Sequence, residues 1–532
     1  MDYGKPAEAC AETGADTGVF KREYPKASVT WDCNTHRGFI HLGHPQQKTD
    51  DTSATSAEDS AEVVIVGAGV AGLTAAFELI ADGVPGHDIV VLEQRAQPGG
   101  RTINIGVPGY PGKHVEAGGT WIGGTQDRVA SLSQRLGLTP KRDFFHTFYK
   151  INDTLLYGKE VYTDDDGRVC TPVRDAWPTR GRAACTQTGS GLGLPVGKQL
   201  LLLRELRAMA KLVSMEAPWT SELKHLDNSS VLTWMKEHGY GDKADIAFVN
   251  GLVGIPLNTD ISKISMLFYL FYENSCPSLD DSGFIGGAQD WRFTEGSQVL
   301  ALRLAAYVTA RGVRIIYNTT AHAVNNNAAS VTITTSVTTS QQQTTVWSAK
   351  HAVVAMGTGD AGRLRYSGIT AQRQALMDSW VRHPGGGVKF FLIYERAFWR
   401  APFFNGSAAV PALGAGTGNA AEGKGEIFFD YSDETGVPGI LAGFAGSGSN
   451  AAGDGGADVP VADREAYLAH QVCKLSNLAL IPGSCNHVGY TEQRWNLTEP
   501  VGGTSNIVQY MPPGMLTANG PAWRRAIGRL VK

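Results

Sequence analysis

The sequence predicts an α/β protein, and three observations lead to this class. A strand, a glycine-rich turn and a helix follow one another in VVIVGAGVAGLTAAFELIADG, residues 63–83. Strand-like and helix-like segments then alternate along the chain, as in parallel sheets covered by helices. Hydrophobic residues make up 42% and charged residues 18% of the 532 residues, which indicates a globular chain with a large core.

The chain is expected to begin with a mobile extension over residues 1–60, because this segment is polar and rich in Ser, Thr, Asp and Gly. Folded structure is expected to start at Val63. No apolar stretch at the N-terminus predicts a signal peptide, and no run of 18 apolar residues within 1–532 predicts a membrane span. A cytoplasmic or peroxisomal protein is favoured.

The remaining elements follow from their hydrophobic periodicity. A helix is expected within residues 217–239, with its start near Asn228 or Ser229. The other expected helices are 128–136, 199–213 and 295–312, and the other expected strands are 88–95, 313–317, 331–335, 351–357 and 388–399.

Composition excludes several classes of function. A net charge of −4 argues against a nucleic-acid binder, which would carry a basic excess. The 7 cysteines are scattered and contain no CxxC pair, so neither a disulfide framework nor a zinc site is expected. The 13 histidines form no HxxxH or HxH cluster, and no GxSxG motif occurs, so neither metal catalysis nor acyl transfer is expected.

Gly67, Gly69 and Gly72 form a GxGxxG motif directly after the first buried strand. In such a motif the first glycine makes a tight turn, the second lets the backbone approach a pyrophosphate, and the third allows the helix to pack on the strand. The helix N-terminus offers N–H groups to the phosphates. Glu93 ends the next strand, where a carboxylate can bind the hydroxyls of a ribose. The spacing predicts a dinucleotide site.

A second glycine block indicates which dinucleotide is bound. GGRT, residues 99–102, and EAGGTWIG, residues 116–123, follow soon after Glu93, and a simple nicotinamide dehydrogenase does not need them. With GAGVAGL and LEQR, these blocks resemble the FAD-containing amine oxidases, most closely the flavin monoamine oxidases. The resemblance continues in order through AFVNGLVGI, GGAQDWRFTEGSQVLALRLA, VKFFLIYERAFWR and EQRWN followed by PVGGTSNIVQYMPPGMLT.

The resemblance implies a two-domain fold with a Rossmann-like FAD domain and an interleaved α+β substrate domain. The FAD domain would comprise residues 61–137, 278–378 and 498–532, and the substrate domain residues 138–277 and 379–497. Relatives continue beyond the PPGxLT block with a further FAD-binding segment, and nothing similar occurs before Lys532. An incomplete FAD site is therefore expected at the C-terminal end, and any membrane anchor or peroxisomal signal would lie beyond Lys532.

Roles for single residues also come from the resemblance. Glu93 would bind the adenosine ribose, Gly100 and Arg101 the diphosphate, and Gly119, Thr120 and Trp121 the flavin edge. Lys389, which interrupts the apolar strand VKFFLIY, would assist reoxidation at flavin N5. A solvated face of an edge strand is the alternative for this lysine. Trp495 would pack near the flavin, and its alternative is an ordinary core tryptophan.

The sequence departs from monoamine oxidases where they place a flavin-linked Cys and an aromatic-cage Tyr. Thr504 and Ser505 stand there, so FAD is expected to be non-covalent and one wall of the cage to be missing. Trp121 and Ile122 replace an arginine that binds the substrate carboxylate in several amino-acid oxidases, which favours amines without a carboxylate. The resemblance further places four residues along the substrate cavity, although an aromatic stripe is often plain core: Phe268, Phe271, Tyr272 and Ser275.

The expected function is an amine oxidase that transfers hydride from the amine α-carbon to FAD and is reoxidised by dioxygen. Aldehyde, ammonia and hydrogen peroxide would be the products. The alternatives are a polyamine or L-amino-acid oxidase of the same superfamily, and a non-catalytic homologue that does not retain FAD. The expected partners are a small amine and dioxygen, and a homodimer is the expected form of assembly, if any.

Overall fold

The computed structural model describes most of residues 58–142, 198–275, 291–381, 387–397, 426–446, 459–475, 485–495 and 510–525, with single strands between 19 and 42 and between 146 and 186. The chain forms two compact units, Met1–Ser56 and Ala57–Lys532. The first unit contains an antiparallel sheet where the polar composition predicted a mobile extension. Its strands are β1 (Val19–Tyr24), β2 (Ala27–Asp32) and β3 (Arg37–Leu42).

A seven-stranded sheet organises the N-terminal part of the second unit. The first four strands across the sheet are parallel to one another. The fifth pairs antiparallel with the fourth and with the sixth, and the seventh is parallel to the sixth. In spatial order the strands are β16 (Arg314–Ile316), β5 (Ile89–Leu92), β4 (Glu58–Val66), β19 (Ser340–Val354), β18 (Val331–Val337), β17 (Thr319–Asn326) and β20 (Arg365–Ser367). β4 begins at Glu58, five residues before the predicted start at Val63, because Glu58–Ala61 continue the pairing with β19.

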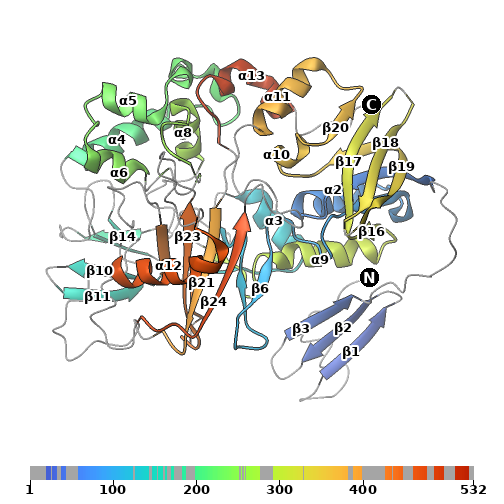
Figure 1. Cartoon of the computed structure of the whole chain (residues 1–532), viewed down its shortest axis with the longest axis horizontal. Helices are drawn as coiled ribbons and strands as arrows, with labels where there is room; N and C mark the ends of the chain where they lie inside the picture. Colours follow the sequence, from blue (N-terminus) through green and yellow to red (C-terminus); the bar gives the residue numbers. More distant parts are fainter. Residues whose placement is uncertain are drawn as a thin grey trace. The chain divides into compact units, whose positions relative to one another are not determined.

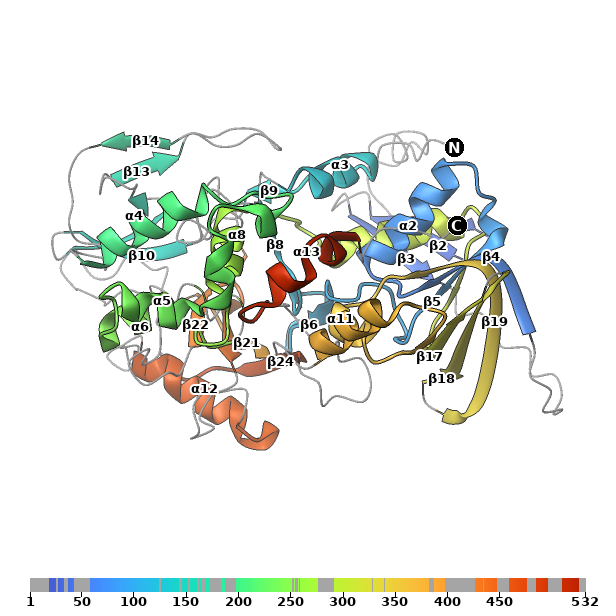
Figure 2. The ribbon, with the colours of Figure 1, turned by 90° about the horizontal axis from the view of Figure 1, so that it is seen from above.

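Both faces of this sheet are buried. Val63 and Ile65 pack with the helices α2 and α9, whereas Val64 and Val66 pack with Ile333 and other residues of the opposite face. Figure 1 shows α2 and α9 beside the sheet, and Figure 2 shows the curved strands β17, β18 and β19. Burial on both faces explains the unbroken apolar run VVIV. The helices are α2 (Val70–Ala81) and α9 (Gln298–Thr309).

A second, antiparallel sheet carries the predicted lysine. Its strands, in spatial order, are β22 (Glu426–Asp430), β23 (Gly439–Gly446), β21 (Gly387–Tyr394) and β24 (Gly489–Trp495). β21 is an interior strand, and every one of its residues is buried. The helix α12 (Val461–Leu475) contributes Leu468 and Val472 to the core on one face, and the hairpin of β6 (Asn104–Gly106) and β7 (His114–Glu116) contributes to the core on the other.

A third core joins helices that are far apart in sequence. It includes residues of α4 (Lys198–Ala210), α5 (Val231–Glu237), α6 (Lys243–Val249), α8 (Met266–Asn274), α11 (Ala371–Val381) and α13 (Met515–Arg525). The helix expected within 217–239 begins after Ser230, not at Asn228 or Ser229, because the Ser230 hydroxyl accepts the hydrogen bond from Thr233 N. The expected helix 128–136 is confirmed as α3 (Asp127–Arg135).

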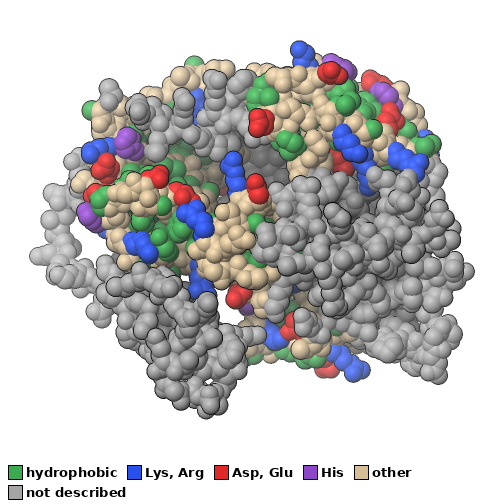
Figure 3. Space-filling view, turned by 180° about the vertical axis from the view of Figure 1, so that it is seen from behind, with side chains coloured by type: hydrophobic (Ala, Val, Ile, Leu, Met, Phe, Trp, Pro, Cys, Tyr) green, Lys and Arg blue, Asp and Glu red, His purple; other side chains and the backbone are tan. Residues whose placement is uncertain are grey.

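Three further findings concern the described residues. Cys485 is disulfide-bonded, although the scattered cysteines predicted no disulfide framework. Among the helices that the structure describes, none is long and apolar enough to cross a membrane. On the described part of the face in Figure 3, basic and acidic side chains are interspersed, in agreement with the small net charge.

Candidate active site

The first glycine turn lies between β4 and α2, and its three glycines meet different constraints. Gly67 has a φ of 109°, and a Cβ there would lie 2.6 Å from the Ala355 carbonyl oxygen. A Cβ on Gly72 would lie 2.0 Å from the Gly67 oxygen, whereas a Cβ on Gly69 would meet nothing closer than 3.7 Å. The protein's own packing therefore requires Gly67 and Gly72. At Gly69 a Cβ would make only ordinary van der Waals contacts, so packing does not require this glycine, and the approach of a pyrophosphate to the backbone would account for it.

The second glycine block lies directly against the first. Gly99 forms an isolated bridge with Gly69, and its N–H donates to the Ala68 carbonyl at 3.0 Å. Gly100 has a φ of 60°, and a Cβ there would lie 3.2 Å from Gly69 Cα. The two glycine blocks thus form one continuous surface without side chains.

Glu93 lies at the edge of this surface and is only 7% exposed. Its Oε2 accepts from Ala68 N at 2.7 Å, and its Oε1 accepts from Arg95 N at 2.9 Å. Burial raises the pKa of the Glu93 carboxyl, and the hydrogen bonds from Arg95 and Ala68 only partly oppose this rise. Hydroxyl donors from a bound ribose would stabilise the buried negative charge further.

Two guanidinium groups and one carboxylate complete this end of the site. Arg101 is exposed to solvent, and desolvation by the surrounding protein lowers the pKa of its guanidinium. Desolvation also lowers the pKa of Arg95, and Asp360 opposes the shift in both arginines. Arg95 also donates to the Gly100 carbonyl at 2.6 Å. A glycine surface with adjacent cations and a carboxylate fits the adenosine diphosphate part of FAD.

Sequence reasoning missed Arg95 and Asp360 as site residues. Arg95 stands within the LEQR block and so offered a signal, because it lies two residues after Glu93. Asp360 lies in the short helix α10 (Thr358–Ala361) and belongs to no motif that the sequence analysis identified.

Residues 116–120, here called the strap, connect β7 to β8 (Trp121–Ile122). The strap lies against Arg101, because Gly119 N donates to the Arg101 carbonyl at 2.9 Å. A Cβ on Gly118 would lie 2.0 Å from that same oxygen, whereas a Cβ on Gly119 would meet nothing closer than 3.8 Å. Gly118 is therefore the glycine that this packing requires. The sequence had pointed to Gly119, Thr120 and Trp121.

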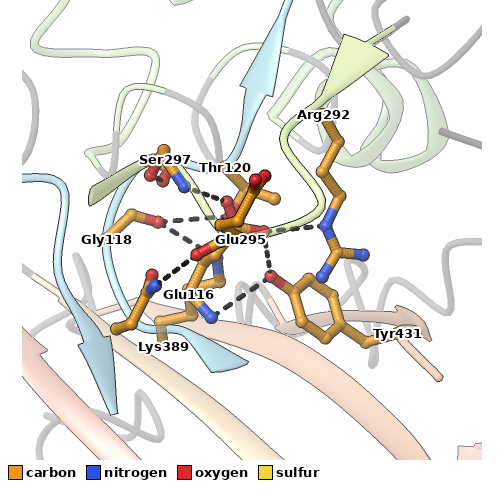
Figure 4. A network of polar contacts seen from close by, with 10 residues as sticks. Glu116, Gly118, Thr120, Arg292, Glu295, Ser297, Lys389 and Tyr431 are labelled. Carbon is orange, nitrogen blue, oxygen red and sulfur yellow. Dashed lines mark hydrogen bonds and ion pairs between the residues drawn. The ribbon is translucent and has the colours of Figure 1, made fainter. Parts of the chain in front are cut away.

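Lys389 in β21 is 1% exposed and points to the strap (Figure 4). Its Nζ donates to the Gly118 carbonyl at 3.0 Å and to Thr120 Oγ1 at 2.6 Å. The solvated edge-strand alternative is wrong, since the strand is interior and the side chain is buried. Four aromatic rings lie with their centroids 5.3 to 5.6 Å from Nζ: Trp121, Phe391, Tyr431 and Phe444.

Trp495 ends β24 and is 1% exposed. Its Nε1 donates to the Ala117 carbonyl of the strap at 2.9 Å, and the Arg95 guanidinium lies 5.7 Å from its ring. It is also the register partner of Gly387, two residues before Lys389. Trp495 therefore contacts the strap, pairs with the strand β21 that carries Lys389, and lies near Arg95, which follows Glu93 in the chain.

Glu116 begins the strap and is fully buried. Its Oε2 accepts from Arg292 Nε at 2.8 Å and from the Tyr431 hydroxyl at 2.6 Å, and its Oε1 accepts from Ser297 N at 2.7 Å. Burial raises the pKa of Tyr431 well above its usual value, so this phenol remains a donor. Glu116, Arg292 and Tyr431 were not predicted as site residues, although Glu116 opens the EAGGTWIG block.

The four residues predicted to line a substrate cavity differ in their surroundings. Phe268 is 6% exposed within the helical core, and Phe271 and Tyr272 are partly buried against the same core. Ser275 is exposed, and its hydroxyl donates to the Tyr272 carbonyl at 2.6 Å. Thr504 and Ser505 lie outside the described residues.

Comparisons with known proteins cover most of the chain. The sequence profile of the flavin containing amine oxidoreductases matches residues 70–522. A Mycobacterium tuberculosis protein assigned as a flavin-containing monoamine oxidase is 26% identical over 477 residues, which are 88% of this chain and 89% of that protein.

Two solved structures share the fold. Cyclohexylamine oxidase from Brevibacterium oxydans superposes with a TM-score of 0.64 at 23% identity, over 88% of this chain and 91% of that chain. Putrescine oxidase bound to putrescine superposes with a TM-score of 0.63 at 22% identity, over 87% of this chain and 90% of that chain.

Proposed function

The chain belongs to the flavin containing amine oxidoreductases, FAD-dependent enzymes that oxidise amines, and on this premise we propose which of its residues hold FAD and which serve the reaction. The observation that carries the proposal is the burial of Lys389 against the strap that adjoins the glycine surface. When bound, FAD would accept a hydride equivalent from the amine α-carbon and pass the electrons to dioxygen, which gives an imine and hydrogen peroxide, and water then hydrolyses the imine to aldehyde and ammonia.

The adenosine diphosphate part of FAD would lie on the two glycine blocks. Gly67 and Gly72 would allow the tight turn and the close packing of the helix, and Gly69 and Gly100 would present backbone to the pyrophosphate. Glu93 would accept hydrogen bonds from the ribose, and Arg101, with Arg95, would face the phosphates.

Lys389 would serve the flavin end of the cofactor. A buried ammonium group favours the negative charge that dioxygen acquires as it accepts electrons. Two neutral oxygens hold this ammonium, and aromatic rings exclude water around it. Thr120 and Trp121 would border the flavin from the strap, and Trp495 would close the site from the opposite strand.

The substrate would be an amine without a carboxylate. The cations beside Trp121 are engaged, since Lys389 binds Gly118 and Thr120, and Arg292 binds Glu116. This arrangement does not favour bidentate binding of an amino-acid carboxylate. Phe271 and Tyr272 of α8 remain the proposed cavity residues.

The two proposed domains have the boundaries given above, except that the FAD domain begins at Glu58, the first residue of β4.

An absorbance spectrum before and after anaerobic addition of amine tests the proposal. Bound oxidised flavin should be present and should bleach, and a peroxide assay with tyramine, putrescine and L-leucine should give signal with an amine but not with leucine. Purified protein without flavin, or no bleaching with a broad amine panel, would refute it. Mass spectrometry of denatured protein tests the non-covalent link, and retained flavin would contradict it.

The role of Lys389 has its own test. Lys389→Met keeps the shape of the side chain and removes its charge, so the reaction of the reduced enzyme with dioxygen should slow by about 100-fold. An unchanged rate would remove Lys389 from the proposal.

Light scattering of the purified protein tests the expected homodimer, and fractionation of the source cells tests the expected cytoplasmic or peroxisomal location.

A further inference from the structure

We propose that Glu116 and Tyr431 are positioning residues for Lys389, acting through the strap. The inference rests on the proposed role of Lys389 and adds two residues to it. Neither Glu116 nor Tyr431 is assigned to flavin or amine in the function proposed above.

Both hydrogen-bond acceptors of Lys389 that the structure describes lie on the strap. Gly118 supplies a carbonyl oxygen and Thr120 a hydroxyl oxygen, two residues apart. The place of the ammonium group therefore depends on the place of the strap. A displacement of about 1 Å at a reacting group can change a rate by about 100-fold.

Three distant elements hold the first residue of the strap. Arg292 comes from β15 (Trp291–Arg292), Ser297 precedes α9, and Tyr431 follows β22, and all three donate to the Glu116 carboxylate. Ser297 also donates through its hydroxyl to the Gly119 carbonyl. One carboxylate and one serine thus fix both ends of the strap to the scaffold (Figure 4).

Tyr431 connects the carboxylate to the lysine more directly. Its hydroxyl donates to the Glu116 carboxylate at 2.6 Å and accepts from Glu116 N at 3.3 Å. The Lys389 ammonium lies 5.5 Å from the centroid of its ring, and the Arg292 guanidinium lies 4.1 Å from the same centroid. Removal of this one hydroxyl should loosen Glu116, the first residue of the strap, and leave the aromatic packing intact.

The experiment compares Glu116→Gln and Tyr431→Phe with the matched control Tyr490→Phe. Tyr490 lies in β24 of the same sheet, and its hydroxyl also donates to a glutamate, Glu492. Hydrogen–deuterium exchange of the apoprotein reports the strap without cofactor. Stopped-flow kinetics of the flavin-loaded protein report reduction by amine and reaction with dioxygen separately.

Exchange of residues 117–121 should be about tenfold faster in both test variants, as expected for the loss of one hydrogen bond to a charged group, and unchanged in Tyr490→Phe. The reaction with dioxygen should slow by about 10- to 100-fold, with reduction by amine changed less than about twofold.

Normal exchange and normal reaction with dioxygen in folded Tyr431→Phe would overturn the inference, even if Glu116→Gln does not fold. Equal slowing of both half-reactions would also overturn it. If Lys389→Met reacts normally with dioxygen, the proposed function of the lysine fails, and the exchange measurement still decides whether Glu116 and Tyr431 hold the strap.

Discussion

Two glycine-to-alanine substitutions in the same turn should affect different properties. Gly72→Ala should destabilise the apoprotein, and Gly69→Ala should weaken the binding of FAD. In Gly72→Ala the new Cβ would lie 2.0 Å from the Gly67 oxygen and 3.2 Å from Ala355 Cβ, and neither neighbour is a flexible side chain. Overpacking of this kind costs about 1–3 kcal/mol or more, and the helix propensity gained by alanine offsets about 1 kcal/mol. We expect a net loss of about 2 kcal/mol in the free energy of unfolding of the apoprotein.

Gly69→Ala is the matched variant. Gly69 is the N-cap of α2 with a φ of −74° and a ψ of 176°, a conformation open to alanine, and its Cβ would meet no atom closer than 3.7 Å. The apoprotein should therefore lose less than about 1 kcal/mol, while the added methyl group occupies the space proposed for the pyrophosphate.

Thermal unfolding of the two apoproteins and titration of each with FAD separate these effects. We expect the unfolding temperature of Gly72→Ala to fall by about 2 °C, because the loss of about 2 kcal/mol is divided by the unfolding entropy of the whole unit Ala57–Lys532. Gly69→Ala should unfold near the wild-type temperature and bind FAD much more weakly. If Gly69→Ala binds FAD as the wild type does, the cofactor does not approach this turn, and the reasoning is refuted.

Three other predictions concern buried polar groups. Glu93→Gln should raise the FAD dissociation constant by about 10- to 100-fold, as for lost hydrogen bonds to a charged group, and an unchanged constant in fluorescence titration would exclude contact with the ribose. Burial raises the pKa of Tyr366 to about 12. The neutral phenol therefore contributes fully to stability below about pH 10, and this contribution is lost as the pH rises through about 12. Tyr366→Phe should remove tyrosinate absorbance that develops near pH 12, and ionisation of Tyr366 near pH 10 would contradict the shift. Asp227→Ala leaves the buried donor Ser265 Oγ and the partly buried donors Thr517 N and Thr517 Oγ1 without their acceptor, and it should cost about 3–5 kcal/mol in unfolding experiments. Asp227→Asn, which keeps one oxygen, should cost less.

The parts of the fold that the sequence predicted depend on local spacing. The turn at Gly67–Gly72, the strand ending before Glu93 and the strand around Lys389 each follow from a short pattern of glycines or apolar residues, whereas the interior position of the last strand does not. The strands β17 and β19 were missed in whole or in part, because TTAHAVNN and SQQQTTVW are rich in Thr, Asn and Gln and show little apolar alternation.

The missed part of the site depends on contacts between distant segments. Glu116 and Tyr431 are 315 positions apart, and no spacing rule connects a carboxylate in one strand to a phenol that follows another. Asp360 likewise acts on Arg95 and Arg101 only because α10 follows the strand β19, which pairs with β4. Such side-chain clusters need the tertiary structure, whereas the glycines are visible because their backbone requirement is local.

Among the described residues, two Arg–Glu–Tyr clusters can be compared, one around the fully buried Glu116 and one around the partly buried Glu492, and their comparison separates stability from positioning. Arg464, Glu492 and Tyr490 form one, in which the guanidinium and the phenol both bind the carboxylate, and it joins α12 to β24. Buried ion pairs of this kind add little net stability, but removal of one partner costs about 3–5 kcal/mol. Glu492→Gln and Glu116→Gln should therefore destabilise the protein to a similar extent in thermal unfolding. Only Glu116→Gln should also change exchange in the strap and the reaction with dioxygen, because only Glu116 holds the segment that supplies the acceptors of Lys389. A slower reaction with dioxygen in Glu492→Gln of equal size would show that lost stability alone accounts for the effect.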